Sequence, residues 1–579
     1  MAVYFLKYET GKVKLAHFSI KEYLVSEYLC TGAASSFHLA EELSHSLITQ
    51  TCLVYLLQFD MFTVDQDVNE SFPLALYAGE HWIFHAKSGG IDKFESSSML
   101  ALALKLLTPE SVPFTNWVRI WNLVKSYSYS RSVKMSQIQE QAGIAGPLYY
   151  ASLAGLQQVS QHLLEKKMDV NAQGGVYGNA LNAASYLGHG EIVKLLLEKG
   201  ADVNMQEGFY GNALHAASYG GNEVIVKVLL EKGMDVNAQG GFHHNALNAA
   251  SCAGSEVIMK LLLEMGADMN VQGGHYGTSL HAASYGGNEV IVKLLLEKGM
   301  DVNVQGGFYG NALSAASCVG NEVIVKLLLE MEADVNVQGG NYGTALHAAS
   351  YGGNEMIVRL LLEKGADMKA QGGEYETVLQ PASYGGHEVI VKLLLDNGSD
   401  VNVKGGEYVT ALQAASYRGH EVIVRLLLEK GADPNVQGGD FGNALQEASY
   451  GGHEMIVRLL LEMGANVDVQ GGWFGTALQA ASYEGHEVIV KLLLENGAHV
   501  NVHAGEYGTA LNAASFSGHE VTVRLLLQKG ADVNVQGGKY GTALQAASSE
   551  GHEVIVKLLL ENGADVHVNN PIIEDRPHF

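Results

Sequence analysis

Cysteine is scarce in this sequence, and no apolar run is long. The four cysteines among 579 residues form no CxxC or other metal-ligand spacing. Their small number gives no reason to expect an oxidising compartment. Charged residues interrupt every apolar stretch well short of the roughly 20 residues that a membrane-spanning helix needs. Too few apolar residues precede Lys7 to form the core of a signal peptide. We therefore expect a cytoplasmic protein.

Signatures of catalysis are also missing from the sequence. It contains no P-loop of the form G-x-x-x-x-G-K-[ST], no G-x-S-x-G nucleophile elbow, no kinase signature and no H-E-x-x-H. Near the start, Gly11 and Lys12 form a Gly-Lys pair, but Leu6 stands where the first glycine of a P-loop would be. We expect no enzyme activity and no cofactor.

The net charge of −26 is unevenly distributed. Residues 1–144 hold 11 basic and 14 acidic side chains, whereas residues 145–579 hold 25 basic and 48 acidic ones. An acidic surface repels nucleic-acid phosphates and anionic lipids. We therefore expect neither nucleic acid nor a membrane as the main partner of residues 145–579. The preferred explanation of the acidity is the need to keep a long stack soluble.

An Ala-Leu pair, or a close variant of it, recurs every 33 residues without insertion. Its first residues are Ala180, Ala213, Ala246, Ser279, Ala312, Ala345, Val378, Ala411, Ala444, Ala477, Ala510 and Ala543. Pro147-Leu148 opens a weaker copy one step earlier, which makes thirteen repeats. A fixed period of this length indicates a stack of similar structural units.

Each repeat contains signals for two helices and a turn. Asn or Thr precedes the Ala-Leu pair and predicts the N-cap of a short helix, which ends at a glycine such as Gly188. A segment such as HEVIVKLLLEKG predicts a second helix that is buried on several sides and ends at a glycine such as Gly200. The Gly-Gly of ADVNVQGG then predicts a hairpin that leads to the next repeat.

This pattern resembles the ankyrin repeat over about residues 145–570. The resemblance implies a mostly α-helical solenoid of about 13 repeats, in which each repeat contacts its neighbours and the stack offers a concave face and a row of fingertips to a protein partner. The sequence departs from the family pattern because Asn/Thr-Ala-Leu replaces Thr-Pro-Leu-His, and Gly-Gly plus an aromatic residue replaces the acidic residue of the finger. This combination is similar to the ankyrin arrays of large fungal receptor-like proteins.

Two positions vary while the rest of the repeat is nearly constant, and we expect both to face solvent. The first lies between the Gly-Gly of the finger and the aromatic residue that follows, here called the finger aromatic. It holds Val176, Phe209, Phe242, His275, Phe308, Asn341, Glu374, Glu407, Asp440, Trp473, Glu506 and Lys539. The second follows the tyrosine of the first helix and includes Arg418. Exposed aromatic side chains are typical binding anchors. The partner-binding hypothesis therefore names Phe209, Phe242, His275, Phe308, Trp473 and Arg418; the alternative is that these positions vary because nothing restrains them.

Two other residue types recur at strict positions. The tyrosines of the first helix, such as Tyr186 and Tyr219, are interpreted as packing residues with hydroxyls that reach water or the backbone, with a binding stripe as the alternative. The histidines of the Gly-His-Glu motif, such as His189 and His387, form a row with a spacing of about 10 Å, too wide to share one metal ion. Asn222 also replaces this histidine. We predict that the row packs at the start of the second helix and expect no metal site.

The regular pattern fails between residues 330 and 400. Glu332 and Glu376 replace glycines, and Pro381 enters the first helix of its repeat near the fourth position, where proline removes one hydrogen bond. We predict that these repeats open first.

The first 144 residues lack the 33-residue period. Alternating apolar residues around Glu9-Thr10-Gly11-Lys12 predict a β-hairpin, and a helix is expected from about Ser19 to Cys30. The segments HFSIKEYLVSEYL (17–29), LITQTCLVYLLQFD (47–60) and SFPLALYAGEHWIFHA (71–86) resemble the region that follows the NACHT nucleotide-binding domain in fungal STAND proteins.

The second resemblance implies four segments: a winged-helix-like end of a NACHT-associated region (1–35), a helical linker region (36–144), the ankyrin array (145–570) and a C-terminal tail (571–579). It also implies that a longer parent protein carries an N-terminal NTPase domain that precedes Met1. Some STAND proteins bind nucleotide phosphate through a winged-helix histidine, but His17 is interpreted as a packed or surface residue. Three tryptophans are expected to pack a small core that joins this region to the stack: Trp82, Trp117 and Trp121.

The sequence as a whole favours a non-enzymatic protein–protein interaction module, the ligand-sensing or scaffold half of a fungal NACHT–ankyrin receptor-like protein. The alternative is a stand-alone ankyrin adaptor or scaffold without a nucleotide switch. An enzyme with an unrecognised active site is disfavoured, because strict structural positions and variable tips offer no convergent pocket.

Overall fold

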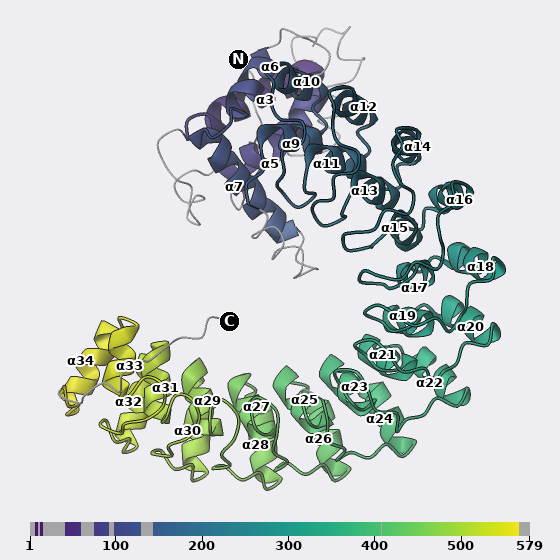
Figure 1. Ribbon diagram of the computed structural model, residues 1–579. Coiled ribbons are helices and arrows are strands. Elements are labelled where there is room, and N and C mark those ends of the chain that lie inside the picture. Colours follow the sequence, from purple (N-terminus) through teal and green to yellow (C-terminus); the bar gives the residue numbers. More distant parts are fainter. Residues whose placement is uncertain are drawn as a thin grey trace. The chain divides into compact units, whose positions relative to one another are not determined.

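The computed structural model describes residues 6–9, 12–15, 41–59, 74–91, 98–128, 143–406 and 408–566. It divides into two compact units, residues 1–268 and 269–579, and each is described by itself. The described chain is mostly helical, as predicted, and from residue 147 onward the helices come in pairs (Figure 1).

The N-terminal hairpin is the one β element of the described residues. Strand β1 (Leu6–Glu9) pairs antiparallel with β2 (Lys12–Leu15), with Leu6 opposite Leu15. The predicted hairpin is therefore confirmed. The helix expected from Ser19 to Cys30, His17 and the tail 571–579 lie outside the described residues.

The described residues between the hairpin and the first repeat include four helices: α3 (Glu41–Leu56), α5 (Ala75–Ser88), α6 (Ser98–Leu106) and α7 (Val112–Ser128). Trp82 and Trp117 are fully buried between them, with their ring centroids 5.7 Å apart. The indole nitrogen of Trp117 donates to the carbonyl oxygen of Gly79 at 3.2 Å. A Cβ at Gly79 would lie 2.4 Å from Ile120, so only glycine lets α5 and α7 approach this closely.

The same core continues into the first repeat. The ring of Trp117 lies 5.6 Å from that of Tyr150 on α9 (Pro147–Ala154), and the Lys87 ammonium donates to the carbonyl oxygen of Ala154 at 3.2 Å. Trp121 also contacts Trp117, at 5.6 Å between ring centroids. These contacts confirm a helical core of tryptophans that reaches the first repeat; the winged-helix-like segment 1–35, which this core was expected to join to the stack, lies mostly outside the described residues.

In the unit 1–268, each repeat has a first helix, called the inner helix, and a second helix, called the outer helix. The inner helices are α9 (Pro147–Ala154), α11 (Ala180–Leu187), α13 (Ala213–Tyr219) and α15 (Ala246–Ala253). The outer helices are α10 (Gln157–Glu165), α12 (Gly190–Glu198), α14 (Glu223–Glu231) and α16 (Glu256–Glu264).

The unit 269–579 repeats the same arrangement nine times. The inner helices are α17 (Ser279–Gly286), α19 (Ala312–Val319), α21 (Ala345–Gly352), α23 (Leu379–Gly385), α25 (Ala411–Arg418), α27 (Ala444–Tyr450), α29 (Ala477–Glu484), α31 (Ala510–Ser517) and α33 (Ala543–Ser549). The outer helices are α18 (Glu289–Glu297), α20 (Glu322–Glu330), α22 (Glu355–Glu363), α24 (Glu388–Asp396), α26 (Glu421–Glu429), α28 (Glu454–Glu462), α30 (Glu487–Glu495), α32 (Glu520–Gln528) and α34 (Glu553–Glu561).

The predicted caps set the ends of the inner helices. The Asn179 side chain accepts the backbone N–H of Asn182, and the equivalent Asn or Thr does the same at α13, α15, α17, α19, α21, α25, α27, α29, α31 and α33. The predicted glycine stop is also present: Gly188 ends α11 in the left-handed region, with φ +79°.

Helix α23 is the exception, because its observed start differs by one residue from the start predicted by the repeat pattern. The helix begins at Leu379, one residue later than its counterparts, and Val378 at its N-cap makes no side-chain cap bond. Pro381 is therefore the third helical residue rather than the fourth, a position whose N–H has no partner within a helix. Glu332 and Glu376 adopt φ +65° and +57°, the strained conformation expected where glycines are replaced.

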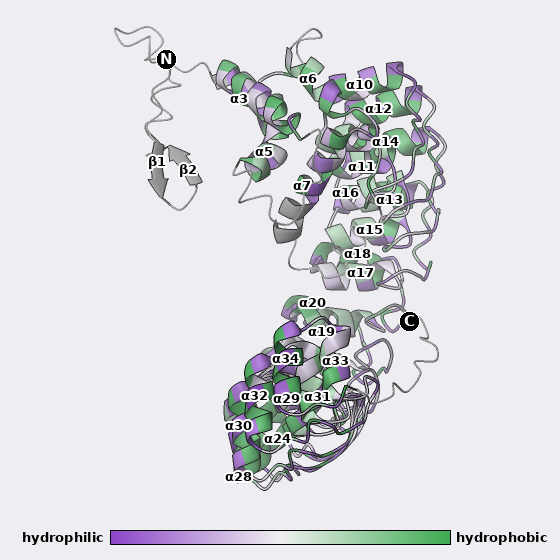
Figure 2. Cartoon of the chain, turned by 90° about the vertical axis from the view of Figure 1, so that its left-hand side faces the viewer, coloured by the Kyte–Doolittle hydropathy of each residue, from purple (hydrophilic) through white to green (hydrophobic). Residues whose placement is uncertain are grey.

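Apolar side chains fill the space between consecutive layers. Ile489, Val490 and Leu493 of α30 are buried, whereas Val488 on the same helix is exposed. Both hydrophobic and hydrophilic residues occur along α30 (Figure 2). Ala480 and Ala481 of the inner helix α29 are fully buried, and their small size lets neighbouring inner helices approach closely. The stack thus buries one side of each outer helix and leaves the other to solvent.

Candidate protein-interaction surface

The tips of the fingers form a backbone ladder in each unit, whose described rungs in the unit 269–579 run from His275 to Glu374 and from Asp440 to Lys539. We call the residue just before each finger aromatic the tip residue. The N–H of Phe242 donates to the carbonyl oxygen of Phe209 at 2.8 Å, and Trp473 donates to Asp440 at the same distance. Further rungs join Val176 to Phe209, His275 to Phe308, Phe308 to Asn341, Asn341 to Glu374, Trp473 to Glu506 and Glu506 to Lys539. Neighbouring tips are therefore about 5 Å apart, as in a β-sheet, and closer than packed helices, which lie about 8–10 Å apart.

Beneath the tips runs a ladder of stacked aromatic rings. The finger aromatic and the tyrosine of the inner helix alternate along it: Tyr285 lies 5.1 Å from Tyr276 and 5.0 Å from Tyr309, measured between ring centroids. The pattern continues to Phe516 and Tyr540 at 4.2 Å. These contacts support the interpretation of the tyrosine row as packing.

The tyrosine hydroxyls lie close to other side chains. Tyr186 neighbours Tyr210, and Glu484 neighbours Tyr450. Burial raises the pKa of Tyr210 well above its usual value of 10. The ladder is therefore an uncharged support for the fingers.

In several inner helices, a buried polar side chain holds the next finger in place. The Gln479 amide nitrogen donates to the carbonyl oxygens of Ala504 at 2.8 Å and Gly508 at 2.6 Å. In α13, the ring nitrogens of His215 lie 3.0 Å from the carbonyl oxygens of Tyr210 and Ala238. We call this position the finger anchor. Its members are Asn182, His215, Asn248, His281, Ser314, His347, Gln380, Gln413, Gln446, Gln479, Asn512 and Gln545.

Sequence reasoning missed the finger anchors. The signal was present, because every member except Ser314 carries an amide or an imidazole. Such side chains are rarely fully buried unless they are hydrogen-bonded, so their recurrence beside strictly apolar positions points to a buried donor.

The Gly-His-Glu histidines bind the preceding repeat rather than a metal. Nε2 of His486 lies 3.0 Å from the carbonyl oxygen of Tyr450, at the end of the preceding inner helix. Asn222 donates to the carbonyl oxygens of Ser185 and Tyr186 at 2.8 and 2.9 Å, which explains why asparagine replaces histidine here. Within the described ranges, no three His, Cys, Asp or Glu side chains are placed to hold a metal ion.

The six residues of the binding hypothesis differ in exposure. Phe209 stacks on Phe242 at 4.6 Å, and His275 stacks on Phe308 at 4.7 Å; all four are half-buried rather than freely exposed. Trp473 is 59% exposed. Arg418 is exposed at the end of α25, with its guanidinium carbon 4.8 Å from the centre of the Tyr384 ring. The structure thus places five of the six on the backbone ladder of the fingertips, which we call the finger ladder, and Arg418 on an inner helix.

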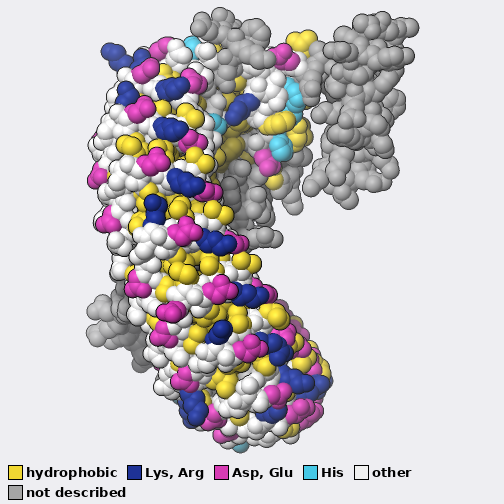
Figure 3. Space-filling model, turned by 90° about the vertical axis from the view of Figure 1, so that its right-hand side faces the viewer, with side chains coloured by type: hydrophobic (Ala, Val, Ile, Leu, Met, Phe, Trp, Pro, Cys, Tyr) yellow, Lys and Arg dark blue, Asp and Glu magenta, His cyan; other side chains and the backbone are white. Residues whose placement is uncertain are grey.

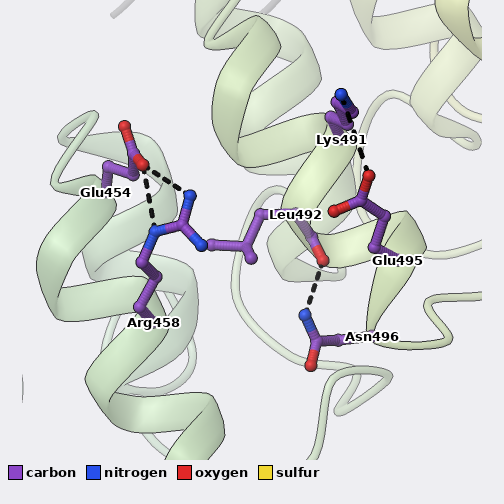
Figure 4. A network of polar contacts seen from close by, with 6 residues as sticks. All are labelled: Glu454, Arg458, Lys491, Leu492, Glu495 and Asn496. Carbon is purple, nitrogen blue, oxygen red and sulfur yellow. Dashed lines mark hydrogen bonds and ion pairs between the residues drawn. The ribbon is translucent and has the colours of Figure 1, made fainter.

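The outer helices carry a second exposed row. It consists of Val224, Val257, Val290, Val323, Met356, Val389, Val422, Met455, Val488, Val521 and Val554, each 53–67% exposed. In the space-filling view of this side, hydrophobic side chains lie among Lys, Arg, Asp and Glu (Figure 3). The charges pair within their own helices: Arg458 contacts Glu454 at 2.7 Å, and Lys491 contacts Glu495 at 3.9 Å (Figure 4).

The last repeat carries one open depression of about 370 Å³, lined by Ser548, Val556 and Leu560 among others. Val556 is half-buried, whereas Val523, its counterpart one repeat earlier, is fully buried by the following layer. The depression is the surface that a neighbouring repeat covers elsewhere in the unit. It contains no arrangement of catalytic groups.

The comparison with protein families agrees with this geometry. The family model "Ankyrin repeats (3 copies)" matches residues 123–207, 181–273, 280–372, 346–438, 438–504 and 478–570. The chain belongs to the ankyrin repeat family. Ankyrin repeats indicate a protein–protein interaction module, and the family is typically non-enzymatic.

A curated relative is "Azaphilone pigments biosynthesis cluster protein L" of Monascus ruber, which is 37% identical to this chain over 181 residues. The match covers 30% of this chain and 37% of the relative, so it spans little more than a third of that protein's length. None of the helices in the described ranges is long and apolar enough to cross a membrane.

Proposed function

We propose that this chain is a non-enzymatic array that binds a protein partner along its finger ladder. The observation that carries the proposal is the division of roles within each repeat. The strict polar residues are used for internal hydrogen bonds, as Gln479 and His486 illustrate, whereas the tip residues vary and several of them reach solvent. A rigid ladder of differing side chains, backed by stacked rings, presents a preorganised surface.

We also propose that the array is the ligand-sensing or scaffold half of a NACHT–ankyrin receptor-like protein. The support is the resemblance of residues 17–29, 47–60 and 71–86 to the region between a NACHT domain and its sensor. Contacts such as Trp117 with Tyr150 are consistent with this proposal, since a sensor must be joined firmly to the part that it controls. The cytoplasm is the compartment that such a receptor would occupy.

The test is selection of binders to the full chain from a display library of fungal protein fragments. Selected fragments are then measured against a variant with Phe209, Phe242, Phe308 and Trp473 changed to alanine. We expect this variant to lose at least about tenfold in affinity, because aromatic anchors dominate protein interfaces. Fragments that bind it as tightly as the original chain would refute the finger ladder as the binding surface.

The dependence of partner capture on nucleotide distinguishes the receptor proposal from the adaptor proposal. Because this sequence contains no P-loop, capture is measured with the proposed longer parent protein, and capture that requires ATP and Mg²⁺ supports a receptor with a nucleotide switch. Capture that is indifferent to nucleotide supports a stand-alone adaptor.

A further inference from the structure

Trp473 differs from every other aromatic tip. Phe209 and Phe242 shield each other, as do His275 and Phe308. Trp473 is 59% exposed and makes no ring contact with another described aromatic side chain. Its own finger aromatic is Phe474, which is buried and stacks 5.9 Å from Tyr507. The fingertip therefore holds its indole outward while the next residue fixes the backbone.

The two neighbouring rungs of the ladder are acidic. The N–H of Trp473 donates to the carbonyl oxygen of Asp440, and the N–H of Glu506 donates to that of Trp473, each at 2.8 Å. Asp440 and Glu506 are both exposed. Strand-like spacing sets the three side chains about 5 Å apart at the backbone. The indole of Trp473 thus lies between two carboxylates on a backbone that is held by hydrogen bonds on both sides.

The charges of this surface are not neutralised by the chain itself. Among the described residues, the ion pairs of this part of the array join residues of the outer helices or loops, and none includes Asp440 or Glu506. Lys539, one rung beyond Glu506, lies over the ring of Tyr540 at 5.8 Å. The array as a whole is acidic, so the field at Trp473 favours a cation.

We infer that Trp473, Asp440 and Glu506 form a recognition point for an arginine or lysine side chain of the protein partner. The indole face attracts the cation through its quadrupole, and the two carboxylates pair with it from the adjacent rungs. This inference rests on the proposed function, since it names the chemistry of the partner at one place on the finger ladder. The outer Val and Met row offers no aromatic face for a cation.

The first experiment measures the local field without any partner. Trp82 and Trp117 are buried and Trp121 is half-buried, so Trp473 is the one exposed tryptophan of the chain. Its fluorescence, isolated by subtracting that of Trp473→Phe, should be quenched more by caesium than by iodide. Asp440→Asn with Glu506→Gln should reduce the caesium quenching constant by about twofold. Equal quenching by the two ions would overturn the inference.

The second experiment titrates the full chain with the basic peptide acetyl-(Gly-Arg)₆-amide and the acidic peptide acetyl-(Gly-Glu)₆-amide. We expect saturable binding of the basic peptide alone. Trp473→Ala should weaken it by about threefold, the usual contribution of an exposed cation–π contact. Asp440→Asn with Glu506→Gln should weaken it by about fivefold, as expected for two exposed ion pairs.

The matched control is Glu429→Gln with Glu462→Gln, which changes the net charge equally at exposed positions near the ends of α26 and α28. It should alter binding by less than about twofold. Equal weakening by the control and the tip variant, or binding of the acidic peptide, would overturn the inference. If display-selected partners still depend on the four aromatic tips while the basic peptide does not bind, the inference fails and the proposed function stands.

Discussion

Two sets of repeats hold their fingers with different side chains at the same anchor position. Histidine occupies it at His215, His281 and His347, and glutamine occupies it at Gln380, Gln413, Gln446 and Gln479. These side chains are buried, and His281 and Gln479 are both placed to donate to carbonyl oxygens of a finger. The comparison teaches that histidine and glutamine can supply the same buried N–H donor. The two donors differ in one respect, because only histidine can take up a proton near neutral pH.

Burial makes the histidine anchors sensitive to acid. Desolvation lowers the pKa of His215 and His347 from 6.5 to about 4, and that of His281 in the same direction. The folded state therefore disfavours the protonated form. The stability that each contributes is present above the unfolded pKa near 6.5 and is lost as the pH falls toward 4.

The largest expected effect is this loss of stability in acid. For His215 alone, a shift from 6.5 to about 4 corresponds to about 3 kcal/mol. We expect the urea midpoint to fall between pH 7 and pH 4 much less in a His215→Gln, His281→Gln, His347→Gln variant than in the original chain. Circular dichroism during urea unfolding at both pH values is the measurement. Identical pH dependence of the two proteins would contradict the comparison.

The next effect removes an anchor of the second set. Gln479→Ala leaves the carbonyl oxygens of Ala504 and Gly508 without their side-chain donor. We expect a loss of about 2 kcal/mol, within the usual range for unsatisfied buried groups, and faster hydrogen exchange in the finger at residues 502–508. Gln479→His at pH 7.5 serves as the control and should retain most of the stability. Unchanged exchange in the alanine variant would show that the finger needs no anchor.

A smaller effect concerns the helix ends, where two repeats form a natural pair. The sequence Leu-Leu-Leu-Glu-Met precedes both Glu332, with φ +65°, and Gly464, with φ +87°. Glu332→Gly should stabilise its repeat by about 1 kcal/mol, and Gly464→Glu should destabilise its own by a similar amount, because only glycine adopts this conformation without strain. Hydrogen exchange at α20 and α28 measures both. Effects of the same sign would contradict the strain argument.

The smallest effect is expected on the outer face. Arg458→Ala removes the ion pair with Glu454, whose two side chains are 43% and 40% exposed. The expected change in stability is about 0.3–0.5 kcal/mol. A loss comparable to that of Gln479→Ala would mean that the outer charges, and not the buried anchors, hold the repeats in register.

The period, the two helices, the caps and the hairpin could be predicted because each depends on local chemistry that recurs every 33 residues. Asn179 and Gly188, for example, act within their own helix. Contacts between repeats were harder to predict. His486 bonds to the repeat before it, and Gln479 bonds to the finger after it. Both contacts depend on distances between layers that no single repeat encodes.

The start of α23 and the exposure of the tips also needed the structure. Helix α23 begins one residue later than its counterparts and lacks a side-chain cap bond. The phenylalanine tips were expected to face solvent alone, but the ladder brings them close enough to shield each other, which leaves Trp473 as the exposed aromatic tip.

The most direct test of the account is hydrogen exchange of the full chain, alone and with a partner selected by display. The account predicts slower exchange at the fingertips around Asp440, Trp473 and Glu506, with unchanged exchange in the outer helices α26, α28, α30 and α32. Protection confined to the outer helices, over the row from Val422 to Val521, would contradict the claim that the finger ladder is the binding surface.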